Sequence, residues 1–161
     1  MDDGRPGDEE QILVSIRRII RAIDLHSRHL LERCGLTGPQ LAALQTLARK
    51  GAMSGVELAR DLRVGAATVT GILDRLEKKG LLTRSKRGDD RRSISISLTD
   101  EGRKLLESAP PLLQERFRQR LAGLQDWERT LLLASLQRIA AMMDAEEVGA
   151  SPHLVTGPER L

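Results

Sequence analysis

Residues 54–98 decide the fold, and they read SGVELARDLRVGAATVTGILDRLEKKGLLTRSKRGDDRRSISISL. Ser54-Gly-Val-Glu57 is a capping box, a pattern that starts a helix because each end of the box satisfies a free backbone N–H group. Arg63-Val-Gly65 then forms a turn, and a second helix runs from Ala66 to Lys79, with Gly80 as its stop. Two short helices joined by a tight turn that contains glycine predict a helix-turn-helix.

The period of the sequence changes after this pair of helices. Residues 81–87 can be extended, and residues 93–98 alternate polar with apolar side chains, as a half-buried strand does. Gly88-Asp-Asp90 between them supplies residues that favour a turn. We therefore expect a basic β-hairpin directly after the helix-turn-helix, which is the arrangement called a wing.

Helical patterns flank this winged segment on both sides. A long amphipathic helix is predicted from Glu10 to Arg33, and Thr37-Gly-Pro-Gln40 caps a second helix. Thr99 caps a further helix that Pro110-Pro111 interrupts, and Asp126 caps the last one. The predicted class is mainly α, with four helices, two strands and two further helical segments. Its predicted divisions are a flexible N-terminus (1–9), a helical lobe (10–35 and 99–145), a winged domain (36–98) and an irregular tail (146–161).

Composition limits the classes of protein. The chain has 161 residues, enough for one domain with a core, and it contains one Phe, one Trp and no Tyr. That scarcity of aromatic residues argues against folds that stack single-stranded bases on aromatic rings. The lone Cys34 excludes an internal disulfide or a multi-thiolate metal site, and the acidic start shows no secretory signal. A cytoplasmic protein without a membrane span is expected.

The positive charge is concentrated in the winged segment. Residues 60–92 hold ten basic and five acidic side chains, a local net charge of +5, so the other residues carry −2 of the total of +3. A solvated charged surface is the ordinary explanation of such a run. Together with the helix-turn-helix and wing it favours binding to duplex DNA, where neutralised phosphates supply most of the sequence-independent affinity.

These motifs together resemble the MarR (multiple antibiotic resistance regulator) family of bacterial winged helix-turn-helix repressors, over roughly residues 12–143. The resemblance implies a homodimer whose N- and C-terminal helices form one lobe, with two winged domains on a pseudo-palindromic operator. The segments that carry it are Gly35-Leu-Thr37 with Gln40, Glu57-Leu-Ala59, residues 69–80 (VTGILDRLEKKG), Asp89-Asp-Arg-Arg92 and Leu98-Thr-Asp-Glu-Gly102.

The DNA-binding residues are expected at the start of the second helix of the helix-turn-helix and in the wing. The helix start can reach base edges in the major groove. Arg75 is expected on a phosphate or in an intrahelical ion pair, and the cations of the wing strands on phosphates, with one or two of them only solvated. By the resemblance, Arg92 enters the minor groove and Asp90 orients it. The full set is Ala66, Ala67, Thr68, Thr70, Gly71, Arg75, Arg84, Lys86, Arg87, Asp90, Arg91 and Arg92.

The resemblance also implies an effector pocket between the helical lobe and the winged domain. Its candidate lining is Ile23, His26, Ser27, Leu30 and Leu44, with Arg28 beside them. His26 and His29 have a spacing that could chelate a metal, but no acidic or thiol partner accompanies them, so a place in the interface or cleft fits His26 better. Cys34 is expected to be a small buried residue, with redox sensing as the alternative.

The function expected from these features is a sequence-specific, DNA-binding transcriptional regulator, most simply a homodimeric repressor of a nearby operon that a small-molecule effector releases. A transcriptional activator and a redox sensor acting through Cys34 remain as alternatives, as does a protein-interaction module that has kept the winged fold. The sequence holds no Ser-His-Asp set, phosphate-binding loop or metal cluster, so neither an enzyme nor a cofactor is expected.

Overall fold

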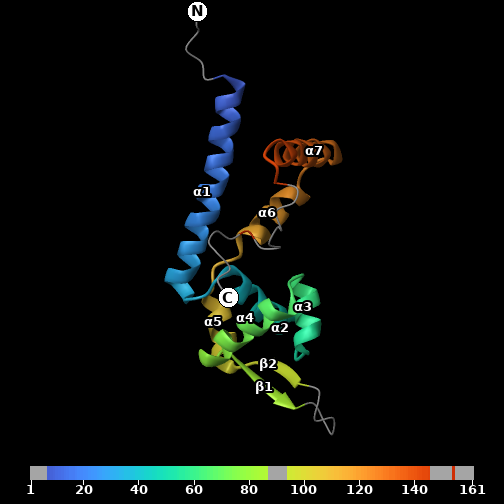
Figure 1. Ribbon diagram of the computed structural model, residues 1–161. Coiled ribbons are helices and arrows are strands. Elements are labelled where there is room, and N and C mark those ends of the chain that lie inside the picture. The colour runs from blue at the N-terminus through green and yellow to red at the C-terminus, as the bar shows by residue number, and fades with distance from the viewer. Residues whose placement is uncertain (1–6, 87–93, 146–153, 155–161) are drawn as a thin grey trace, which may run out of the picture.

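The computed structural model describes residues 7–86, 94–145 and 154. Helices α2 to α5 and the hairpin form one cluster at the lower end of the molecule, from which α1 rises, and α7 lies at the end away from the hairpin (Figure 1). The elements are α1 (Asp8–Cys34), α2 (Gly38–Lys50), α3 (Gly55–Leu62), α4 (Ala66–Lys78), β1 (Leu82–Lys86), β2 (Ile94–Leu98), α5 (Asp100–Ser108), α6 (Leu113–Ala122) and α7 (Asp126–Met142). This is the mainly helical fold with a small two-stranded sheet that the sequence predicts.

The hydrophobic core lies in the cluster formed by α2, α3, α4 and the hairpin. The two predicted capping boxes start α2 and α3: the Thr37 N–H donates to Gln40 Oε1 over 3.0 Å, and the Ser54 N–H donates to Glu57 Oε2 over 2.7 Å. Aliphatic residues fill the space between the elements. The largest fully buried side chains are those of Leu30, Leu36, Leu41, Leu44, Leu58, Leu76, Ile96 and Val69.

The hairpin packs one face on this core. Strands β1 and β2 are antiparallel, with Leu82 opposite Leu98 and Lys86 opposite Ile94. Leu82, Ile96 and Leu98 are buried. Met53 also forms a β-bridge with Ile96, which ties the segment before α3 to the hairpin. The predicted turn at Gly88-Asp-Asp90 lies outside the described residues.

The turn between α3 and α4 lies at residues 63–65, where the sequence predicts it. Arg63, not Gly65, takes the left-handed conformation, with φ of 55° and ψ of 42°. Its N–H donates to the Arg60 carbonyl and that of Val64 to the Ala59 carbonyl, which closes the end of α3. Gly65 is instead the extended residue before α4.

The C-terminal helical segments are three separate helices. Thr99 Oγ1 accepts from the Gly102 N–H over 3.1 Å, as a predicted N-cap should, and α5 ends at Ser108. Because Pro110-Pro111 lacks two backbone donors, the chain leaves the helix and restarts at Leu113. Gly102 sits so close to the hairpin that a Cβ there would lie 2.2 Å from the Leu81 carbonyl oxygen. None of the helices in the described part of the chain has the length and apolar character that crossing a bilayer requires.

Candidate nucleic-acid interface

The start of α4 presents small and hydroxyl side chains to solvent. One face of α4 is buried through Val69, Ile72, Leu73 and Leu76. On the other face Ala66, Ala67 and Thr70 are exposed and Thr68 is half-buried. The residues predicted to read bases therefore share an accessible face. The Thr70 hydroxyl donates to the Ala66 carbonyl over 3.0 Å, so its oxygen keeps lone pairs with which it can act as an acceptor.

Gly71 adds bare backbone to this face of α4. A Cβ built there would meet nothing within 4 Å, so packing within the chain does not require glycine at this position. An open glycine in a helix costs stability relative to alanine, roughly 1 kcal/mol. Its value for close approach by another molecule agrees with the predicted place of Gly71 at the interface.

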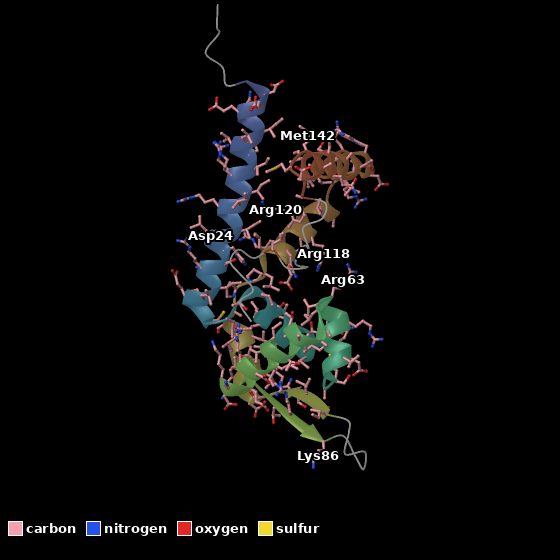
Figure 2. All side chains as sticks on the ribbon, in the orientation of Figure 1. Asp24, Arg63, Lys86, Arg118, Arg120 and Met142 are labelled. Atoms are coloured by element: carbon pink, nitrogen blue, oxygen red, sulfur yellow. The ribbon has the colours of Figure 1, made fainter. Side chains whose placement is uncertain are left out.

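The cations of the interface have different surroundings. Arg75 on α4 is exposed, and Lys86 lies exposed at the end of β1 that points away from the helices (Figure 2). Arg84 in the middle of β1 is ion-paired with two carboxylates of α4: its Nη2 is 2.6 Å from Asp74 Oδ1 and its Nη1 is 3.0 Å from Glu77 Oε2. The predicted residues Arg87, Asp90, Arg91 and Arg92 lie outside the described residues.

Of the residues predicted to line the effector pocket, His26 lies at a junction between α1 and α6. His26 Nε2 accepts the backbone N–H of Leu113, the first residue of α6, over 3.0 Å. Burial, and then the positive charge of Arg116 and His29, lowers the pKa of His26 below its ordinary value of 6.5. Neutral imidazole is the form that can accept this hydrogen bond. The histidine thus satisfies a free donor at the start of a helix.

The other residues predicted for the crevice divide into two groups. Ile23 and Ser27 are half-buried near His26, and the Ser27 hydroxyl donates to the Ile23 carbonyl over 2.9 Å. Leu30 and Leu44 are closed into the core, at 1% and 0% exposure, so they do not face an open cleft in this structure. Arg28 is exposed and pairs with Asp24 over 2.8 Å.

Cys34 lies apart from any cluster of ligating side chains in the described ranges. It is half-buried at the end of α1, and its Sγ donates to the Leu30 carbonyl over 3.0 Å. Among the residues that the structure describes, no three His, Cys, Asp or Glu side chains come together as a metal site.

Sequence reasoning missed the contacts that hold α4 in place. Lys79, at the end of α4, donates to the Gly35 carbonyl at the end of α1. In the sequence, Asp74 and Glu77 are only charges that oppose the basic run. Their spacing of three residues puts them on one helix face, but only the strand register shows that Arg84 meets that face.

A second surface, distant from α4, is apolar and open. An open groove runs between the N-terminal half of α1 and α7, lined by Gln11, Ile12, Ser15, Ile16, Ile19, Leu136 and Ile139. Large apolar side chains on the two helices that form the groove are roughly half exposed. They include Ile12, Ile19, Ile20, Leu131, Leu132, Leu133 and Leu136.

Comparison with known proteins agrees with this geometry. A sequence model described as the MarR family matches residues 36–94. The regulator PecS of Dickeya dadantii is 34% identical over 137 residues, which cover 82% of each chain. The repressor MdtR of Bacillus subtilis is 36% identical over 56% of this chain and 59% of its own. Among solved structures, Bordetella bronchiseptica BpsR is similar with a TM-score of 0.55 and 28% identity, over 81% of this chain and 98% of its own.

Proposed function

Since this chain belongs to the MarR family of helix-turn-helix transcriptional regulators, we propose that it acts as a homodimer on a pseudo-palindromic operator and represses a nearby operon until a small-molecule effector releases it. The observation that carries the proposal is the exposed start of α4, small and free of charge, in a winged region whose strand β1 ends on the exposed cation Lys86. Such a helix start fits the major groove, and cations beside it fit phosphates.

The exposed apolar side chains of α1 and α7 support the proposed dimer. Leu131, Leu133 and Leu136 are 60%, 57% and 52% exposed, and all lie on a single helix. A helix that exposes large apolar side chains on several of its sides is usually covered by other protein surface. A second copy of the chain is the simplest partner for this surface, because a two-fold axis then holds two winged domains at one fixed spacing on the DNA.

Effector release is proposed at the junction of α1 and α6. In BpsR of Bordetella bronchiseptica, 6-hydroxynicotinic acid regulates DNA binding. In this chain the half-buried His26 lies at the junction, close to the charge of Arg116. A ligand that binds one arrangement of these helices more tightly increases the population of that arrangement. The spacing of the two winged domains in the dimer changes with it. Repression rather than activation is proposed because the relative MdtR is a transcriptional repressor.

The test is selection of a duplex from a random-sequence pool by the purified protein. We expect enrichment of a sequence with two half-sites about one helical turn apart, and an affinity that falls steeply as salt rises. Ala67→Glu places a carboxylate on the exposed start of α4 and should abolish enrichment. The matched control is Ala122→Glu, the same change at an exposed position at the end of α6, which should preserve it. Equal enrichment by both variants would contradict the assignment of α4 as the reader.

A further inference from the structure

One guanidinium on strand β1 forms ion pairs with two carboxylates of α4. Arg84 directs Nη2 to Asp74 and Nη1 to Glu77, at 2.6 and 3.0 Å. The Arg84 side chain is 26% exposed, less than those of Asp74 at 48% and Glu77 at 40%. A planar guanidinium can hold two carboxylates at once in a fixed geometry, which an ammonium group cannot do as specifically.

The backbone of both elements determines this contact. Asp74 and Glu77 are three residues apart on α4 and so lie on one face of it. Arg84 is two residues from Leu82 and therefore on the same strand face, the face that is buried at Leu82. Its partner across the hairpin is Ile96, which is 1% exposed. The guanidinium thus extends along the helix side of the strand.

We propose that Arg84 is a positioning residue that fixes the wing on the recognition helix, with Asp74 and Glu77 as its partners, and that it does not bind a DNA phosphate. The inference rests on the proposed function, because it concerns how the reader binds duplex DNA. It replaces the expectation, drawn from the sequence, that Arg84 is one of the phosphate contacts.

The charge of the cluster supports a positioning role. One guanidinium and two carboxylates carry a net charge of −1, so the group as a whole offers a phosphate no attraction. Two carboxylates beside a DNA interface repel phosphates and so weaken DNA binding, unless they also position a side chain that the interface needs. Here they fix a cation of the strand, as charge-assisted hydrogen bonds do well.

This contact holds the hairpin and α4 in a fixed relative position before DNA binds. The hairpin and the start of α4 must engage the same duplex together, and any freedom between them has to be lost on binding. Exposed ion pairs contribute little to folding. The effect of breaking the cluster should therefore appear in DNA affinity and selectivity, with thermal unfolding almost unchanged.

The experiment uses the full-length protein, a duplex of about 30 base pairs that the wild type has selected from a random pool, and a scrambled duplex of equal composition. The variants are Arg84→Met, which keeps an unbranched apolar stem without the charge, Asp74→Asn with Glu77→Gln, and all three changes combined. We expect Arg84→Met and the Asp74→Asn, Glu77→Gln variant each to bind the selected duplex about tenfold more weakly than wild type. The triple variant should lose no more affinity than either, since all three variants disrupt the same ion-pair cluster. Binding to the scrambled duplex and the slope of log affinity against log salt should stay unchanged for Arg84→Met.

The matched control is Lys86→Met, which removes an exposed cation two residues further along the same strand. Loss of a phosphate contact should reduce the salt slope by about 0.9 and weaken both duplexes alike. If Arg84→Met behaves as Lys86→Met should, and the Asp74→Asn, Glu77→Gln variant binds more tightly than wild type, Arg84 is a phosphate contact and the inference is wrong. A wild-type protein that selects no duplex overturns the proposed function itself, an outcome distinct from the first.

Discussion

The winged region and the long helices at the other end of the molecule use the same aliphatic residues in opposite ways. Leu41, Leu44 and Leu58 in the winged region have 0% exposure, whereas Leu131 and Leu133 in α7 have 60% and 57%. The winged region therefore completes its core within one chain. The apolar side chains of α1 and α7 stay exposed in one chain, and the proposed dimer would cover them.

The largest effect should come from opening the closed core. Leu58→Ala removes a fully buried side chain from α3 and should lower the free energy of unfolding by about 3 kcal/mol, at any protein concentration. The matched change is Leu133→Ala, at an exposed position of α7, which should alter stability only through the concentration-dependent dimer. Chemical denaturation at two protein concentrations separates the two. A loss of equal size in both variants would erase the distinction between the regions.

A charge in the open groove should break the proposed dimer. Leu136 lines the groove between α1 and α7, and Leu136→Glu would desolvate a carboxylate against a second copy. We expect a monomer, with affinity for the selected duplex lower by about 100-fold because the two readers are no longer linked. Sedimentation equilibrium measures the mass. Leu136→Met is the conservative control, and a Leu136→Glu protein that stays dimeric would mean that this groove is not the interface.

A smaller effect should follow from relieving the backbone at Arg63 in the winged region. An L-residue in the left-handed conformation is strained, and glycine removes the strain at the cost of a more flexible unfolded chain. Arg63→Gly should raise the free energy of unfolding by about 0.5 kcal/mol. Arg60→Gly, within α3, should lower it, since glycine is unfavourable inside a helix. Thermal unfolding of the two variants tests the assignment, and a loss of stability in Arg63→Gly would speak against it.

The smallest effect concerns His26, which joins α1 to the start of α6. Its pKa is lowered in the folded chain, so below pH 6.5 the unfolded chain takes up the proton first. The contribution of His26 to the free energy of unfolding is therefore fully present above pH 6.5 and decreases as the pH falls from there toward the lowered pKa. Protonation also removes the acceptor for the Leu113 N–H. His26→Gln should show a shallower decline than wild type in denaturant titrations over this range. Identical pH profiles would show that His26 does not contribute to it.

The sequence predicted the elements whose signals are local. The capping boxes at Thr37 and Ser54, the alternation of residues 93–98 and the proline pair each act through neighbouring residues, and they correctly indicate where α2, α3, β2 and α6 begin or end. The helix-turn-helix follows from them. The accessible face of α4 was also predictable, because helical spacing alone separates Ala66, Ala67 and Thr70 from the buried residues.

The contacts between distant segments could not be predicted in this way. That Arg84 meets Asp74 depends on the strand register, and that His26 accepts from Leu113 depends on how α6 restarts after the prolines. Leu30 and Leu44 have the same apolar character whether they line a cleft or fill a core. Only the tertiary structure shows that both belong to the buried core cluster.

The mass of the complex between the protein and its selected duplex tests the central claim most directly. Native mass spectrometry should give two chains per duplex of two half-sites, and one chain per duplex, more weakly bound, for Leu136→Glu. A complex of one wild-type chain per duplex, with affinity equal to that of Leu136→Glu, would contradict the account: the open face of α1 and α7 would then play no part in DNA recognition.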